Sequence, residues 1–343
     1  MRRLALLAAA LLALSSAALG QAILEGTLPA LFPADNWWNT DISRAPVDPG
    51  SAAFIAFIGA GRTLHPDFGG AASPPAPDIY GFPWATVGGN QPKVSVDFDY
   101  ADESDAVGYP IPSEAISQPR WVEGGYPASC DPDGAGSPCS GDDHMLIVDR
   151  DNLLLYELYR VHFDGSRWHA GSGALFDLTR NARRPEGWTS ADAAGLAILP
   201  GLVRFDEAAG PAEIAHALRV TVRATNGYVF PASHRAGGTE GALPMGARLR
   251  LKASLDLSPY PPAVAKIFRA MQRYGLIVAD NGSDMFISGA YDTRWDNDVL
   301  NPAFGSLAAG NFDLIELGWQ PAPAASPAVI PVAAPPATAV GGR

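Results

Sequence analysis

Carboxylates on two predicted strands are the first candidates for catalytic chemistry. Asp97 and Asp99 stand two residues apart in an alternating segment, so both side chains project from its polar face. Glu157 lies in a later, mostly apolar segment that also carries Tyr159. Glycoside hydrolysis needs two acids, because one protonates the leaving oxygen while the other attacks the sugar or activates water. We therefore predict Glu157 with Asp97 or Asp99 as the catalytic pair, and solvated strand acids without a catalytic role are the alternative.

Two histidines and a tyrosine offer a second chemistry. His144 begins an apolar segment, and His234 follows an aromatic one. Either histidine, together with Tyr159, could abstract a proton beside a uronate carboxylate, while Arg160 or Arg184 neutralises that carboxylate. This is the chemistry of a polysaccharide lyase. A histidine–metal centre is a third alternative, although the separations of the histidines match no pattern of metal ligands.

Tryptophans in polar loops predict a surface for sugars. Trp188 lies in the segment Arg-Pro-Glu-Gly-Trp-Thr-Ser-Ala-Asp (184–192), and its flat apolar face suits stacking on a sugar ring. A role in the core or as the lid of a helix is the alternative for each tryptophan. The predicted substrate-binding residues are Trp37, Trp38, Arg160, Asn181, Arg184, Glu186, Trp188 and Asp192.

Aspartates in two turns toward the end of the chain suggest calcium. These residues are Asp280, Asp284, Asp292 and Asp296. Oxygen-rich turns can hold Ca²⁺, but neither turn carries the Glu that closes an EF-hand loop. Solvated turn residues are the alternative, and we predict no other cofactor and no other metal ligand.

The elements that must position these residues are mainly strands. Short alternating or apolar segments predict strands over 93–100, 144–149, 153–162, 218–223, 247–253, 277–280, 285–288 and 312–317. Helices are predicted over 262–274, over 51–58 and from about Ser190. The 36 Gly and 31 Pro favour many turns over a helical bundle. We expect a mainly β fold, an antiparallel β-sandwich or a partly closed barrel with long loops and a few short helices.

The two ends of the chain differ from its body. Residues 1–20 combine two arginines, an apolar run and small residues, which is typical of a secretory signal peptide and too short for a membrane span. Residues 321–343 are rich in Pro and Ala, which predicts a disordered tail. We expect a single β-rich domain over 21–320, secreted into an extracellular or periplasmic space.

Charge and cysteine content narrow the range of partners. The formal net charge of −12 makes a phosphate backbone a poor partner, so we predict no nucleic-acid binding. No later segment is apolar over the length of a membrane span. Cys130 and Cys139 lie in a short loop rich in Gly and Pro, which predicts a disulfide in an exported chain.

Four motifs resemble a family of secreted, largely uncharacterised bacterial proteins. They are Leu-His-Pro-Asp-Phe-Gly (64–69), Gly-Trp-Thr-Ser-Ala-Asp-Ala-Ala-Gly-Leu (187–196), Pro-Gly-Leu-Val-Arg (200–204) and Val-Ala-Asp-Asn-Gly-Ser (278–283). The resemblance covers nearly all of residues 31–317. It implies an exported single-domain protein and assigns a catalytic role to no residue.

These features together favour a secreted carbohydrate-active enzyme, foremost a polysaccharide hydrolase with paired carboxylates. A polysaccharide lyase and a non-catalytic glycan-binding protein are the alternatives, and the expected partner is a polysaccharide or oligosaccharide in each case. Catalysis requires an acid, a base and a positioning surface around one substrate. We therefore expect at least four of the segments 97–99, 144, 157–159, 181–192 and 234 to meet in one cleft, with Trp188 at its rim.

Overall fold

The computed structural model describes residues 22–70, 79–131, 134, 137, 139 and 141–322. The predicted signal peptide and the predicted tail, apart from its first two residues, lie outside this part of the chain. These residues form four sheets and four short α-helices, and strand residues outnumber helical ones among them. Within the described residues, no helix is both long enough and apolar enough to cross a membrane.

A five-stranded sheet forms one half of the molecule. In spatial order the strands are β1 (Ile23–Leu24), β5 (Trp84–Val87), β7 (Met145–Asp149), β8 (Leu154–Tyr159) and β11 (Ser172–Asp177). Parallel and antiparallel pairs both occur in this sheet, because β5 pairs with β7 in parallel while the other neighbours are antiparallel. The strands predicted over 144–149 and 153–162 form the antiparallel β7–β8 pair.

A six-stranded mixed sheet forms the other half. In spatial order the strands are β16 (Phe312–Leu314), β13 (Arg248–Leu251), β14 (Leu276–Asn281), β12 (Leu218–Val222), β15 (Phe286–Ser288) and β2 (His65–Asp67). The central strands β12 and β14 are parallel, and β13 and β15 pair with them in antiparallel fashion. The smaller sheets contain β6 (Val96–Phe98), β10 (Trp168–Ala170) and β9 (His162–Phe163), and β3 (Gly69–Gly70) with β4 (Ile79–Tyr80).

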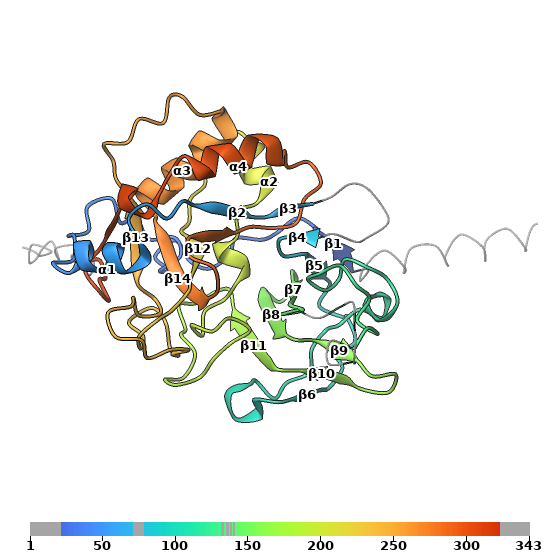
Figure 1. Cartoon of the computed structure of the whole chain (residues 1–343). Coiled ribbons are helices and arrows are strands. Elements are labelled where there is room, and N and C mark those ends of the chain that lie inside the picture. Colours follow the sequence, from blue (N-terminus) through green and yellow to red (C-terminus); the bar gives the residue numbers. More distant parts are fainter. Residues whose placement is uncertain are drawn as a thin grey trace, which may run out of the picture.

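The helices gather mainly beside the six-stranded sheet. Figure 1 shows three of them close together at the top of the molecule, with the β6–β10–β9 sheet at the opposite end. The helix expected over 262–274 is confirmed, and the sequence also located the first helix correctly. The helices are α1 (Ser51–Ile58), α2 (Phe205–Ala209), α3 (Pro262–Arg273) and α4 (Asn297–Gly305). No helix starts at Ser190, because its hydroxyl binds the backbone of a turn instead.

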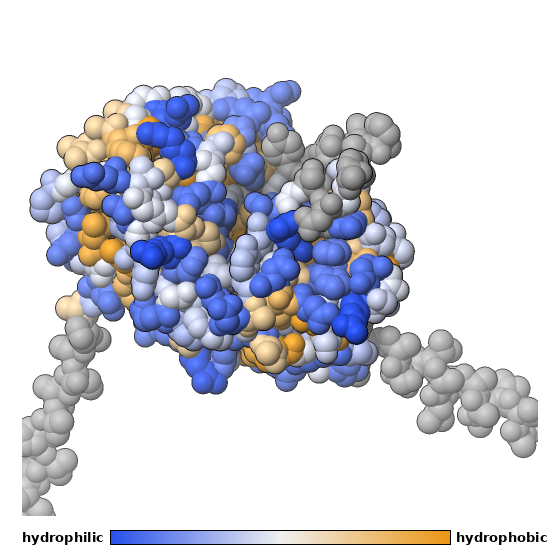
Figure 2. Space-filling view, turned by 60° about the horizontal axis from the view of Figure 1, so that its bottom comes forward, coloured by the Kyte–Doolittle hydropathy of each residue, from blue (hydrophilic) through white to orange (hydrophobic). Residues whose placement is uncertain are grey.

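The expectation of a mainly β fold with few short helices is confirmed, and its finer form is corrected. The two large sheets are mixed rather than antiparallel, and no sheet of the described residues closes into a barrel. The disulfide between Cys130 and Cys139 is present. On the face drawn in Figure 2, hydrophilic residues predominate and apolar residues form separate smaller groups.

The core lies on both faces of the five-stranded sheet. On β8, Leu155 packs into the larger apolar cluster, which also includes residues of the six-stranded sheet. Its neighbours Tyr156 and Leu158 pack into a second cluster on the opposite face. Side chains alternate along a strand, so Glu157 points to the same side as Leu155 and is buried. The β8 residues near Glu157 are therefore shielded from solvent on both faces.

Candidate functional site

A cavity of about 510 Å³ lies where residues of the two large sheets approach each other. The five-stranded sheet contributes Tyr159 and Ser172, and β14 contributes Asp280 and Asn281. The remaining wall comes from loops and from a 3₁₀ turn at Ala101–Glu103. Four carboxylates line this space, and we call it the acidic cavity: Glu103, Asp142, Asp192 and Asp280.

The structure brings four of the five expected segments to this cavity. Of the residues predicted for catalysis or substrate binding, His144, Tyr159, Asp192 and His234 line it, and so does Asp280, which was predicted as a calcium residue and pairs with Arg219 instead. Trp188 does not, although the next residue, Thr189, does. The volume falls in the range of small-molecule sites, which commonly hold convergent polar groups. The acidic cavity is therefore the candidate functional site.

The loop over residues 189–195 is held to the backbone around it. The Ser190 hydroxyl donates to the Leu196 carbonyl at 2.6 Å and accepts from the Asp192 amide at 2.9 Å. Gly195 has φ +72°, and a Cβ atom there would lie 2.1 Å from the Ser233 hydroxyl oxygen. Only glycine fits this turn without displacing its neighbours. The loop is thus a fixed wall of the cavity.

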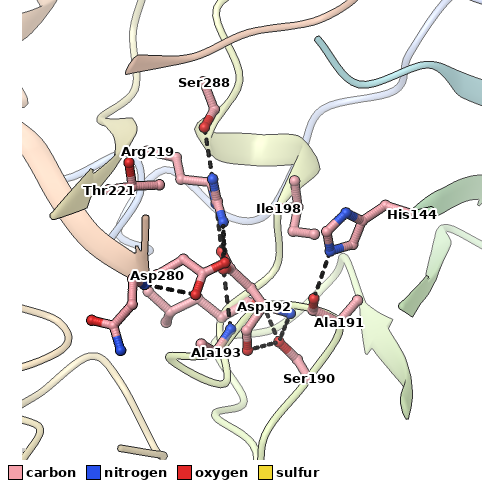
Figure 3. Close-up of polar contacts among 12 residues, drawn as sticks. His144, Ser190, Ala191, Asp192, Ala193, Ile198, Arg219, Thr221, Asp280 and Ser288 are labelled. Atoms are coloured by element: carbon pink, nitrogen blue, oxygen red, sulfur yellow. Dashed lines mark hydrogen bonds and ion pairs between the residues drawn. The ribbon is translucent and has the colours of Figure 1, made fainter. Parts of the chain in front are cut away.

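Arg219 of β12 joins two of the cavity carboxylates. Figure 3 shows its guanidinium between Ser288 on one side and Asp192 and Asp280 on the other. Its contacts to the two Asp192 oxygens measure 2.8 Å each, which is the bidentate geometry that suits a guanidinium. The contact to Asp280 measures 3.0 Å. Asp192 is therefore a paired, buried carboxylate, while Asp280 shares the same cation from the cavity side.

Asp280 holds its proton more strongly than an ordinary aspartate. Burial raises the pKa of Asp280 to about 6, against the opposing charge of Arg219 and with a further rise from the charge of Asp192. A carboxyl group with a pKa near the working pH can donate a proton to a substrate. Its side chain is 24% exposed, so a substrate in the cavity can reach it.

His144 is fully engaged and cannot act as a base. Its Nδ1 lies 2.5 Å from Glu123 Oε2, and its Nε2 lies 2.9 Å from the Ala191 carbonyl oxygen. Both partners are acceptors, so both ring nitrogens carry protons. Burial favours the neutral ring, but the charge and hydrogen bond of Glu123 outweigh it and raise the pKa of His144 to about 9. The predicted base is instead a buried cation that holds the loop in place (Figure 3).

One ring nitrogen of His234 is hydrogen-bonded to the backbone, and the other faces Glu103. Its Nδ1 donates to the Ala193 carbonyl oxygen at 2.8 Å, which leaves Nε2 as the basic nitrogen of the neutral ring. That nitrogen lies 3.7 Å from Glu103 Oε2, whose carboxylate also accepts the Thr189 amide at 3.0 Å. Burial and the nearby charge of Asp142 raise the pKa of Tyr159, so this phenol is a poor base.

Glu157 is not placed for the catalytic role expected of it. Its side chain is 0% exposed and accepts the backbone N–H groups of Ile198 and Leu199 at 2.8 to 3.0 Å. Burial raises its pKa to about 7, although these hydrogen bonds oppose the rise. The prediction treated its strand face as solvent-accessible, whereas β8 is covered on both faces. Glu157 instead anchors the turn over Leu199–Gly201.

Asp97 and Asp99 also lie outside the acidic cavity. Both are exposed, and Asp97 makes a 3.3 Å contact with the exposed Arg167. Asp97 lies on β6 of the three-stranded sheet, and Asp99 directly follows that strand. The structure does not bring either aspartate together with Glu157, because both aspartates are exposed to solvent whereas Glu157 is fully buried.

The predicted sugar-binding residues have mixed placements. Trp38 is fully buried and Trp37 is 9% exposed, so both are core residues with no face for a sugar ring. Arg184 is buried, ion-paired with Asp105 at 2.5 Å and stacked on the Trp188 ring. The other predicted residues lie outside the cavity: Asn181 bonds to Asp35 and Asn36, Glu186 pairs with Arg183, and Arg160 follows Tyr159.

The predicted calcium turns use their carboxylates in other interactions. Asp284 pairs with Arg223, Asp292 pairs with Arg294, and Asp296 caps α4 by accepting the Asp298 amide. Among the residues that the structure describes, no three His, Cys, Asp or Glu side chains form a metal-binding group. Calcium binding at these turns stays a prediction.

A larger cavity of about 720 Å³ lies elsewhere, against the segment that begins at Glu25. Its polar groups are already paired, since Glu207 contacts both Arg204 and His216 and Glu25 contacts Arg120. Burial would raise the pKa of Glu207, but the charge of Arg204 and the hydrogen bonds from Arg204 and His216 lower it to about 2. Neutralised pairs of this kind indicate a structural role, so we place the candidate site in the acidic cavity.

Sequence reasoning missed Glu103, Asp142 and Arg219. Glu103 ends a short 3₁₀ turn and Asp142 lies in a loop, neither with a recognisable motif, and Arg219 occupies a strand whose sequence is otherwise mostly apolar. A charged residue inside an otherwise apolar strand is a signal, because it requires a buried partner.

Comparison with models of protein families, with curated proteins and with solved structures finds no match. The family resemblance of the four motifs stays a prediction.

Proposed function

We propose that the protein is a secreted polysaccharide hydrolase whose acidic cavity uses Asp280 as general acid and Glu103 as the base that activates water. The supporting observation is a carboxyl group with a pKa raised to about 6 in the same cavity as a carboxylate that accepts a backbone N–H bond. In glycoside hydrolysis, the surroundings of the two carboxyl groups set their pKa values apart. This difference decides which group acts as the acid and which as the base or nucleophile. The proposal keeps the paired-carboxylate chemistry expected from the sequence but assigns it to Asp280 and Glu103.

The proposed reaction balances through these two groups. Asp280 donates its proton to the glycosidic oxygen as the bond from the anomeric carbon to that oxygen breaks. Water attacks the same carbon and gives a proton to Glu103, with His234 Nε2 positioned beside that carboxylate. Tyr100, which is 52% exposed at the cavity, offers an aromatic face to a sugar ring. Export is supported by the predicted signal peptide and by the disulfide, because disulfides persist in oxidising compartments.

The cavity supports a lyase less well than a hydrolase. A uronate lyase needs a cation against the substrate carboxylate, and no Lys or Arg side chain is among the described residues that line the cavity. Of the predicted bases, Tyr159 holds its proton more strongly than usual and His144 is doubly bonded, which leaves His234 alone for that role. These observations favour hydrolysis of a substrate without a carboxylate at the cleaved linkage.

The test is an activity screen of the full chain without its predicted signal peptide, on neutral, amino-sugar and uronate polysaccharides. We expect new reducing ends, and loss of at least about 100-fold in rate for Asp280→Asn and Glu103→Gln. Asp97→Asn is the matched control, because it removes an exposed carboxylate outside the cavity. The rate should fall as pH rises above about 6, when Asp280 loses its proton. Full activity of Asp280→Asn, or unsaturated ultraviolet-absorbing products, would contradict the proposal, and glycan binding without any product would favour the non-catalytic alternative.

A further inference from the structure

The polar groups that line the acidic cavity are unevenly divided between hydrogen-bond donors and acceptors. The hydroxyl of Ser172 donates to the Ser190 carbonyl at 2.6 Å, and the hydroxyl of Thr189 donates to the Asp192 carbonyl at 3.2 Å. Ser190 and both nitrogens of His144 likewise donate to backbone or carboxylate oxygens. These donors of the cavity wall are therefore already used by the protein itself.

Acceptors remain available in the same wall. The carboxylate of Glu103 is partly exposed, and Asp142 is exposed. A ligand that supplies hydrogen-bond donors therefore fits these carboxylates.

The negative charge of the cavity also favours a ligand with cationic hydrogen-bond donors. Arg219, behind the wall, makes its bidentate contact with Asp192, and Glu123 pairs with His144. The charges of Glu103 and Asp142 are not matched by a Lys or Arg among the described lining residues. A cavity of one sign concentrates ligands of the opposite sign, and the Tyr100 ring at its edge can also attract a cation.

We propose that the sugar bound in the acidic cavity carries a protonated amine, as in a glucosamine oligosaccharide. This inference rests on the proposed function and specifies its substrate class. An ammonium group has three donors and a positive charge, which suits the carboxylates of Glu103 and Asp142. An N-acetyl group would bring no positive charge to these carboxylates, and a uronate would bring a negative charge toward them. Both should bind more weakly.

The test compares binding of three tetrasaccharides to the full chain without its predicted signal peptide, by calorimetry at about pH 6, where amines are protonated. The ligands are tetramers of glucosamine, of N-acetylglucosamine and of galacturonic acid. We expect the glucosamine tetramer to bind at least about tenfold more tightly than either other ligand, with an affinity that falls as salt screens the charges. Asp142→Asn and Glu103→Gln should each weaken its binding several-fold, whereas the Asp97→Asn control should not.

Each result separates this inference from the proposed function. Equal or tighter binding of the acetylated or acidic tetramer, or no binding of the glucosamine tetramer, overturns the inference. Selective binding of the glucosamine tetramer without release of reducing ends supports the inference and contradicts the hydrolase. Cleavage of a neutral polysaccharide, with no preference for the amine in the binding assay, supports the hydrolase and overturns the inference.

Discussion

Replacing Glu157 tests whether this carboxyl group is structural, as its contacts indicate. Glu157→Ala would leave the N–H groups of Ile198 and Leu199 buried without an acceptor. Each unsatisfied buried group costs about 1–3 kcal/mol, so we expect the free energy of unfolding to fall by about 2–6 kcal/mol. Glu157→Gln keeps one acceptor oxygen and most of the volume, and should cost far less.

The two variants should also differ from the wild type in their dependence on pH. The folded-state pKa of Glu157 is raised from its ordinary value of 4.5 to about 7. The stability that this group contributes is therefore complete below about pH 4.5 and is lost as pH rises through about 7. The loss amounts to about 3 kcal/mol at 1.36 kcal/mol per pKa unit, and Glu157→Gln should lack it.

Urea unfolding at about pH 5 and pH 8, followed by circular dichroism, measures both effects. The difference between variant and wild type isolates Glu157 from other titrating groups, and Asp97→Asn serves as the exposed control. We expect Glu157→Gln to gain stability relative to the wild type between these two pH values. Unchanged stability of Glu157→Ala, or a wild-type pH dependence in Glu157→Gln, would refute the structural assignment of this residue.

Two further predictions follow from the site and from the disulfide. In nuclear magnetic resonance titrations, His144 should keep both ring protons up to a titration midpoint of about pH 9. Glu123→Gln should lower that midpoint, because the Glu123 charge stabilises the imidazolium cation. A midpoint near 6.5 in the wild type would contradict this assignment. The stability from His144 is present below about pH 6.5 and lost as pH rises through 9. Changing Cys130 and Cys139 together to Ser should lower the free energy of unfolding by about 2–3 kcal/mol at most, because the bridge closes a short loop, and a larger loss in urea unfolding would show that it supports more than that loop.

Much of the fold could be predicted from local patterns. The alternation and apolar runs of the sequence located β7, β8, β12 and β14 to within a few residues, and α3 followed from the spacing of its apolar face. These features depend on neighbours along the chain, so they can be read from it. Parallel pairing of β5 with β7 and of β12 with β14 could not, because it joins strands far apart in sequence.

The candidate site could likewise be predicted from the sequence only in part. Residue types and aromatic loops led to His144, Tyr159, Asp192 and His234, which do share one cavity. Their roles depended on the tertiary structure, because a carboxylate on an alternating strand can face solvent, as Asp97 does, or a covered face, as Glu157 does. Which side of a sheet is covered depends on packing of distant segments. Only the folded chain could therefore show that Asp280 lies beside Arg219 and lines the same cavity as Glu103 and Asp142.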